Sequence, residues 1–173
     1  GGGQVLRTSL ALSALLGREI RIEGIRAGRP RPGLAAQHLA GVRAAAAVSD
    51  ARVEGAALGS TSLTFRPGPL SGGHFRFDVG TAGATTLVLQ TILPCLLFAR
   101  VDACVQITGG TNVPWSPPQE YLAHVFLPAL AEMGATVGFE CLTPGFYPKG
   151  GGIIEARVRP ITHPLRPLSW AER

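Results

Sequence analysis

Three arginines in one short segment are the first residues with an evident chemistry. The stretch "IRAGRPRPG" carries Arg26, Arg29 and Arg31 among prolines and glycines, which stiffen the backbone and let it approach a ligand. Arginine binds phosphate through paired hydrogen bonds, so this loop is a candidate phosphate site. Gln37 and His38 follow at the start of the next predicted helix, where they would face the same cleft. The alternatives are a solvated basic turn and a structural histidine.

Glycines precede an apolar, helix-like stretch at two places, in "GGGQVLR" (1–7) and "GTAGATTLVLQ" (80–90). The free N–H groups at the start of a helix attract anions, so either stretch could hold a phosphate. Neither is a P-loop, which needs a following GK[ST], and neither is a GxGxxG fingerprint. Close packing of a helix against a strand is the alternative role of these glycines.

Further polar and aromatic residues follow the second glycine run. Gln90 interrupts an apolar helix, and its amide can form paired hydrogen bonds with a base edge or cap a neighbouring loop. Trp115, in "WSPP", could stack on a base or fill the core. His74, His124 and His163 lack the neighbours typical of a catalytic centre.

The three cysteines have no metal-ligand spacing, which favours structural thiols over a metal site. These cysteines are Cys95, Cys104 and Cys141.

Composition and charge narrow the function classes. With 173 residues, of which 46% are apolar, the chain can bury a sizeable core. Residues 1–83 hold ten arginines and five acidic residues, whereas residues 84–173 hold six of each sign, so the net charge of +5 lies in the first half. This asymmetry favours a polyanionic partner. No apolar run reaches the roughly 18 residues of a membrane span, which predicts a soluble, intracellular protein.

An internal repeat organises the chain. At an offset of about 82 residues, Leu6 and Leu10 correspond to Val88 and Ile92, and Gln37 corresponds to Gln119. Each copy predicts helix, strand, helix, strand, strand, so that a preceding strand would complete a βαβαββ unit.

In the first copy, the periodicity predicts helices over 5–16 and 34–48, strands at 20–25 and 52–58, and a hairpin of 62–65 with 75–79. In the second copy, it predicts helices over 85–98 and 119–133, strands over 103–108 and 136–140, and a hairpin within 146–158.

Five blocks in a fixed order closely resemble the RNA 3'-terminal phosphate cyclase family. They are "GGGQVLRTSLALSALLG", "IRAGRPRPGLAAQHL", "GTAGATTLVLQTILPCLLFA", "GGTNVPWSPP" and "GFYPKGGG". The resemblance implies an α+β fold of tandem βαβαββ repeats, similar to the C-terminal domain of translation initiation factor three, with helices on one face of four-stranded sheets. Residues 1–80 and 81–160 look like its first two repeats, and 161–173 like the linker to an inserted small domain.

The resemblance also implies an ATP-dependent reaction. A histidine attacks the α-phosphate of ATP, AMP passes to the RNA 3'-phosphate, and the 2'-OH closes a 2',3'-cyclic phosphate while AMP leaves. The family's nucleophilic histidine is expected beyond Arg173, so no catalytic residue is assigned here and this chain alone is expected to be inactive. A glutamate of the family, near the metal and triphosphate, would precede Gly1, so the chain resembles an N-terminal part cut at both ends, its first strand missing.

Residue by residue, the resemblance implies that Arg7 and Gln37 line the nucleotide pocket, Gln90 contacts the nucleotide and Pro117 borders the adenine. The implied cofactors are ATP with Mg²⁺ or Mn²⁺, and no metal ligand is assigned in this chain. The implied partner is RNA with a 3'-terminal phosphate, in the cytoplasm or in a eukaryotic nucleus, with a homo-oligomer or the rest of the same protein as further partner. The implied RNA- or phosphate-binding residues are Arg26, Arg29, Arg31 and His38.

Two other functions compete with the cyclase. The first is a non-catalytic, cyclase-like factor in ribosome biogenesis, against which the retention of Arg7, Gln37 and Gln90 argues. The second is an enolpyruvate-transfer enzyme of the same fold, which would need a second set of basic residues in the neutral half of the chain.

Overall fold

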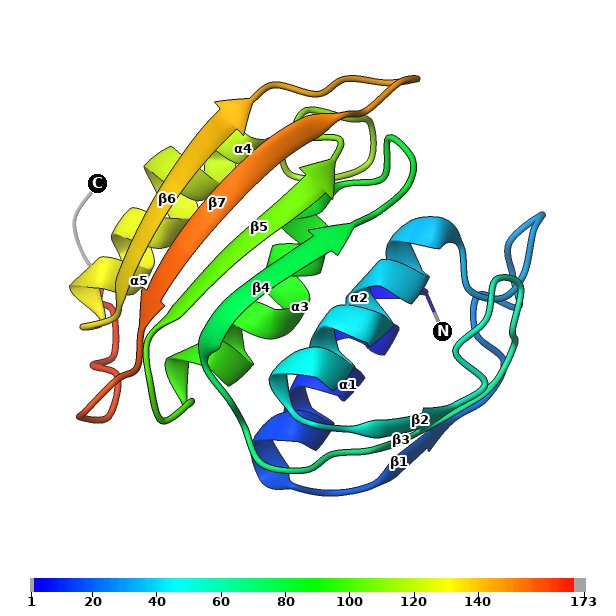
Figure 1. Cartoon of the computed structure of the whole chain (residues 1–173), viewed down its shortest axis with the longest axis horizontal. Coiled ribbons are helices and arrows are strands. Elements are labelled where there is room, and N and C mark those ends of the chain that lie inside the picture. The colour runs from blue at the N-terminus through cyan, green and yellow to red at the C-terminus, as the bar shows by residue number, and fades with distance from the viewer. Residues whose placement is uncertain (1, 170–173) are drawn as a thin grey trace.

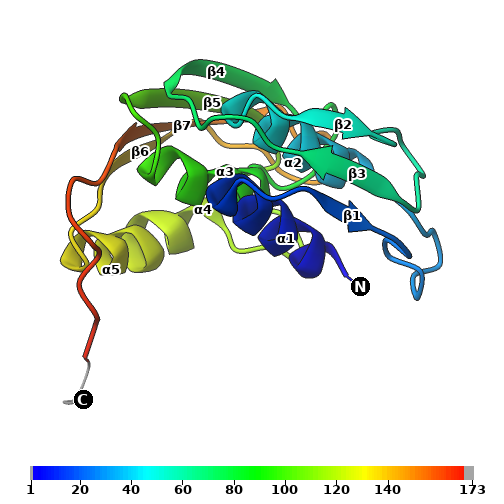
Figure 2. The same cartoon turned by 90° about the horizontal axis from the view of Figure 1, so that it is seen from below.

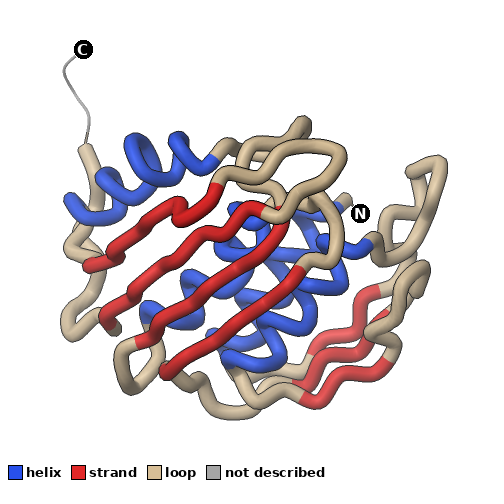
Figure 3. The backbone as a smooth tube through the Cα atoms, turned by 45° about the horizontal axis from the view of Figure 1, so that its top comes forward, coloured by secondary structure: helices blue, strands red, loops and turns tan. Residues whose placement is uncertain are grey.

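The computed structural model describes residues 2–169, which form two sheets with the helices gathered on one side (Figures 1–3). The chain is an α+β protein, as predicted. Helices α1, α2 and α3 contact one another, so the helices that cover the two sheets form one continuous layer. The helices are α1 Gly3–Leu16, α2 Ala36–Val48, α3 Thr85–Leu97, α4 Gln119–Tyr121 and α5 Leu127–Glu132, with a π-helical turn, η1 Leu122–Phe126, between the last two.

The four-stranded sheet is a complete βαβαββ unit. Its order is β4-β5-β7-β6, with β4 parallel to β5 and the remaining pairs antiparallel. Helix α3 connects β4 to β5, and α4, η1 and α5 connect β5 to β6. Its strands are β4 Gly73–Asp78, β5 Ala103–Gly109, β6 Thr136–Thr143 and β7 Gly152–Arg159.

The smaller sheet repeats this arrangement with one strand fewer. Its order is β1-β3-β2, and all its pairs are antiparallel, as in the β5-β7-β6 part of the larger sheet. Within residues 2–169 it therefore has three strands where the repeat predicts four. These strands are β1 Ile20–Ile22, β2 Arg52–Glu54 and β3 Leu63–Arg66.

The predicted hairpin of 62–65 with 75–79 is wrong. Strand β3 pairs with β1 and β2, whereas β4 pairs with β5 in the other sheet, although the first predicted repeat (1–80) includes it. The segment between them is a crossing and not a tight turn: the N–H groups of Gly68 and Ser71 donate to carbonyls at the end of α2. The Gly73 N–H then donates to the carbonyl of Asp102 at 2.8 Å, which starts the pairing with β5.

Two predictions in the second copy also need correction. The hairpin is made by β6 and β7, so only one strand lies within 146–158 and residues 144–151 form its loop. The helix predicted over 119–133 is interrupted by η1. Pro128 explains the interruption, because it lacks the N–H that would bond to the carbonyl four residues earlier.

The other helices begin and end close to their predicted limits. Helix α1 ends at Gly17, whose φ of 62° is the left-handed conformation that glycine adopts without strain. Residues related by the repeat occupy equivalent core positions, since Leu6, Leu10, Val88 and Ile92 are all buried. The repeat offset is thus confirmed at the level of packing.

The end of the described chain runs back along the helices. The N–H of Ile161 donates to the carbonyl of Leu97, and that of Arg166 to the carbonyl of Met133. The last four residues of the predicted linker, 170–173, lie outside the described residues. Among residues 2–169, no helix is both long enough and apolar enough to cross a membrane.

Burial predicts that replacing two leucines of α1 by alanine will lower the free energy of unfolding by different amounts. Leu10 is 0% exposed and Leu12 is 50% exposed. We expect Leu10→Ala to lower the free energy of unfolding by about 2 to 5 kcal/mol, because it leaves a cavity between the helices. Leu12→Ala is the matched control and should cost less than about 1 kcal/mol. Urea unfolding measures both, and equal losses would contradict this view of the core.

Candidate functional site

Two adjoining cavities run along the exposed side of α3 and form one groove. The first, of about 410 Å³, lies between α3 and the α4–η1 segment, and the second, of about 370 Å³, lies between α3, α1 and α5. Gln90 and Phe126 line both cavities, so these side chains stand where the two meet. Each cavity has the size of a small-molecule site.

The first cavity is a mostly apolar slot with one amide. Leu87, Pro117, Tyr121 and Leu122 contribute to its walls, and Gln90 is exposed into it. An apolar cavity of this size with a single amide suits a heterocyclic base, because the faces of the base are apolar and its edge carries donors and acceptors. The structure therefore brings together two predicted nucleotide contacts, Gln90 and Pro117.

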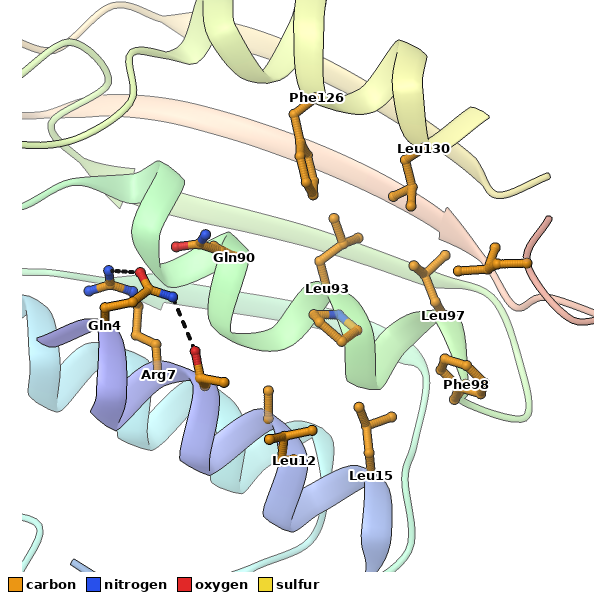
Figure 4. A pocket seen from close by; sticks show the side chains of 14 residues that line it. Gln4, Arg7, Leu12, Leu15, Gln90, Leu93, Leu97, Phe98, Phe126 and Leu130 are labelled. Atoms are coloured by element: carbon orange, nitrogen blue, oxygen red, sulfur yellow. Dashed lines mark hydrogen bonds between the residues drawn. The ribbon is translucent and has the colours of Figure 1, made fainter. Parts of the chain in front are cut away.

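A polar cluster on α1 lines the second cavity opposite Gln90 (Figure 4). The Arg7 guanidinium donates to Gln4 Oε1 at 2.7 Å, and Gln4 Nε2 donates to Thr8 Oγ1 at 3.1 Å. These bonds hold Arg7 along the helix with its side chain toward the groove. Figure 4 shows Gln90 at the same end of the cavity as Gln4 and Arg7, whereas leucines and Phe98 line the other end.

Positive charge concentrates where α1 begins. His38 lies against this helix start, since a Cβ at Gly3 would be 2.4 Å from His38 Nε2. Burial, then the charges of Arg26 and Arg7, lower the pKa of His38 from 6.5 to about 4. Burial also lowers the pKa of Arg7. His38 is therefore neutral near pH 7, between two cations and the positive end of a helix dipole.

Two buried nitrogen atoms of this cluster have no hydrogen-bond partner among residues 2–169. They are Arg7 Nε and His38 Nδ1. Leaving a buried donor unpaired costs about 1 to 3 kcal/mol, so such groups normally have a ligand, an ion or water. Two unpaired nitrogens amid positive charge have the chemistry of an anion site.

The arginine loop interacts with this cluster through the charge of Arg26. Arg26 adopts a φ of 53°, and its Nη1 donates to the carbonyl of Gly33 at 2.7 Å, so the guanidinium closes the loop on itself. Its charge acts on His38, as the lowered pKa of that histidine records. Arg29 and Arg31 are exposed at the surface of the loop.

The second glycine run is occupied by protein hydrogen bonds. Gln37 Oε1 accepts from the Ala84 N–H at 2.8 Å, so the amide predicted for the nucleotide pocket ties α2 to the start of α3. The N–H groups of Gly80 and Gly83 donate to Asp78 and Thr81, and that of Thr85 donates to Gly110. The glycines there serve packing, whereas no side chain in residues 2–169 caps the start of α1.

Two residues that position the site escaped the sequence analysis. Thr86 Oγ1 donates to the carbonyl of Pro117 at 2.8 Å and so fixes one wall of the base-sized slot. Gln4 bonds to residues three and four positions further along α1, and this helical spacing was a usable signal. Nothing in local spacing relates Thr86 to Pro117, which lies thirty-one residues away.

The remaining histidines and the cysteines do not assemble a second centre. In residues 2–169, no three His, Cys, Asp or Glu side chains are grouped to hold a metal ion. The three cysteines are free thiols, and burial raises the pKa of Cys95 to about 11. Cys95 therefore behaves as a packing residue.

Within residues 2–169, the fold is thus one complete βαβαββ unit joined to a similar unit of three strands, with Arg7 and Gln90 in the groove between their helices. The family model of "RNA 3'-terminal phosphate cyclase" matches residues 1–170. The chain belongs to this family, as predicted from its motifs.

Curated relatives agree with this assignment. The RNA 3'-terminal phosphate cyclase of Archaeoglobus fulgidus is 55% identical over 160 residues, which are 92% of this chain and 49% of that protein. Its counterpart in Ralstonia nicotianae is 52% identical over 173 residues, all of this chain and 50% of that protein. That of Thermococcus kodakarensis is 49% identical over 172 residues, 98% of this chain and 50% of that protein. The chain spans about half the length of the curated relatives it matches.

The lowered pKa of His38 predicts a measurable pH dependence. Between pH 6.5 and about 4 the unfolded chain binds a proton at His38 that the folded chain does not, so the free energy of unfolding falls as the pH falls through this range. We expect His38→Gln to reduce that slope in urea unfolding.

The same histidine should respond to an anion. In NMR titrations, pyrophosphate should raise the pKa of His38, because a bound anion favours the imidazolium. Chloride at equal ionic strength is the control. A His38 pKa near 6.5 that pyrophosphate leaves unchanged would contradict the proximity of Arg7 and Arg26.

Proposed function

We propose that the protein containing this chain converts the 3'-terminal phosphate of RNA to a 2',3'-cyclic phosphodiester with ATP, and that this chain supplies the nucleotide groove. One observation carries the proposal: Gln90 and Pro117 line a base-sized slot that continues into the cavity lined by Arg7. The names of the curated relatives support the substrate and the product. No observation favours a non-catalytic role or enolpyruvate transfer.

In this proposal the groove holds ATP along α3. The adenine occupies the slot between Pro117 and Leu87, with the Gln90 amide on its edge. The phosphates extend toward Arg7, which lines the second cavity, and a side-chain shift would bring the buried, unpaired Arg7 Nε and His38 Nδ1 to their oxygens. A neutral His38 can donate one hydrogen bond to a phosphate oxygen, and Arg7 supplies charge.

The proposed chemistry has three balanced steps. A histidine nitrogen bonds to the α-phosphorus of ATP and pyrophosphate leaves; the RNA 3'-phosphate oxygen then takes AMP and frees the histidine. Finally the 2'-OH bonds to the 3'-phosphorus, loses its proton, and AMP leaves. We assign the nucleophile outside this chain, so that residues 1–173 bind and orient ATP but do not form the covalent intermediate.

Arginines of the first half would bind the RNA end. Arg26 lies close enough to His38 to lower its pKa, and Arg29 and Arg31 are exposed on the same loop. This places a basic surface beside the phosphate end of the groove, as a polyanionic substrate requires. A divalent cation, Mg²⁺ or Mn²⁺, would accompany the triphosphate, although within residues 2–169 no three His, Cys, Asp or Glu side chains are grouped to hold it.

Gln90→Ala tests the nucleotide groove. Binding buries a polar edge of the adenine, which the variant leaves unpaired, at a cost of about 1 to 3 kcal/mol. We expect the dissociation constant of ATP for this chain, measured by calorimetry, to rise about 5- to 150-fold. Thr61→Ala, a change at an exposed position outside both cavities, is the control. An unchanged ATP affinity in Gln90→Ala would refute the position proposed for the base.

The double change of Arg26 and Arg29 to Ala tests the RNA contact. Each phosphate neutralised on a single strand adds roughly 0.7 to the slope of log affinity against log salt. We expect the variant to bind 3'-phosphorylated RNA more weakly and with a slope lower by about 1.4. Arg52→Ala, on the exposed face of β2, is the control. Identical slopes would make the loop an ordinary solvated turn.

A further inference from the structure

Three aromatic side chains stand in solvent at one end of the larger sheet. Trp115 is fully exposed, Tyr147 is 73% exposed and Phe146 is 57% exposed. They lie on two loops, 109–118 after β5 and 144–151 between β6 and β7. Large aromatic rings are usually buried, so three exposed ones on adjoining loops form an unusual surface, called the aromatic rim below.

The two loops are fastened to each other. The N–H groups of Thr111 and Asn112 both donate to the carbonyl of Gly145, and the Gly145 N–H donates to Thr111 Oγ1 at 3.0 Å. A bridge also pairs Asn112 with Phe146. Trp115 is three residues beyond Asn112, so its Cα lies within about 11 Å of the Cα of Asn112. The rings are thus presented from one fixed base.

The aromatic rim borders the groove. Pro117, which lines the base-sized slot, is two residues from Trp115 and is held by Thr86. On the other side, a Cβ at Gly150 would lie 2.8 Å from the Cα of Ala82, just before α3. Both loops therefore pack beside the N-terminal half of α3, which faces the slot. Figure 1 shows them together at the end of the sheet where β5 and β6 finish.

The charges of the rim are of one sign. Lys149, the single lysine of the chain, is exposed on the second loop, and neither loop contains an acidic residue. The nearest acidic residue along the chain, Glu120, accepts a hydrogen bond from Asn112 Nδ2 at 2.6 Å. Glu120 is the carboxylate beside these loops and is paired with the Asn112 amide, so the aromatic rings and Lys149 suit a ligand with flat rings and a phosphate backbone.

We propose that the aromatic rim binds the unpaired nucleotides preceding the 3' end of the RNA, by stacking bases on Trp115 and Tyr147 while Lys149 contacts the backbone. The inference rests on the proposed function, since it takes RNA as the substrate. Stacking is indifferent to base identity, because every base has an aromatic face. The rim would thus select single-stranded ends and tolerate many sequences.

The chain offers two direct reporters of this surface. It has two tryptophans, so in a Trp170→Phe background the fluorescence comes from Trp115 alone. We expect a 3'-phosphorylated oligoadenylate of about 12 nucleotides to quench that fluorescence. Because Lys149 is the single lysine, acylation followed by peptide mapping reports one side chain, and the same RNA should protect it.

Affinity measurements on variants complete the test. Trp115→Ala and Tyr147→Ala should each weaken binding of the oligonucleotide about 10-fold, the loss expected for one stacked base, and leave ATP binding unchanged. Leu58→Ala removes an exposed apolar side chain elsewhere, in the β2–β3 loop, and should have no effect. A blunt duplex of the same sequence should bind more weakly than the single strand, since its bases are already stacked.

The outcomes separate this inference from the proposed function. If RNA binds and depends on Arg26 and Arg29, but Trp115→Ala and Tyr147→Ala match the wild type, the rim is not an RNA site and the proposed function stands. Equal affinity for duplex and single strand, or rim variants that change self-association in sedimentation instead of RNA binding, also overturns the inference. If the wild-type chain binds no RNA, the RNA contact in the proposed function fails and the inference fails with it.

Discussion

Burial of α3 is the constraint on which the rest of the structure depends. Eleven of its thirteen residues are buried, because the helix is covered by its own sheet on one side and by α1 and α2 on another. Its three threonines are buried with their hydroxyls bonded to carbonyls, whereas Gln90 is exposed where the covering stops. The groove is therefore the uncovered strip of the central helix. Its position follows from the packing of two similar units around one element.

The cluster at the start of α1 brings the like charges of Arg7 and Arg26 close to His38. Burial and the charges of Arg26 and Arg7 disfavour the charged form of His38 and lower its pKa. Within residues 2–169, no ion pair links Arg7 or Arg26 to a carboxylate. A bound anion would offset these like charges, which is why the proposed function directs the phosphates of ATP to this cluster.

Sequence patterns predicted the helices and the repeat well, because the buried residues of a helix recur every three to four positions and can be seen within a short segment. They failed on β4, since its alternating pattern fits either sheet and the partner is set by the bond of Gly73 to Asp102, far along the chain. For the site, motifs brought out Arg7, Gln90 and Pro117, which line one groove. They could not reveal that Gln37 ties α2 to α3, or that Thr86 holds Pro117, because both bonds join distant segments.

The π-helical turn before α5 changes the direction in which the side chains of the groove wall point. One additional residue in a turn advances a helix by about 100°, so the side chains after η1 face a different direction from those that an unbroken α-helix starting at Gln119 would present. Phe126, the last residue of this turn, borders both cavities. The partition between the base-sized slot and the cavity lined by Arg7 thus depends on an angular offset within one helix. Deleting a single residue there, such as Ala123, would rotate the partition without removing any residue that lines it.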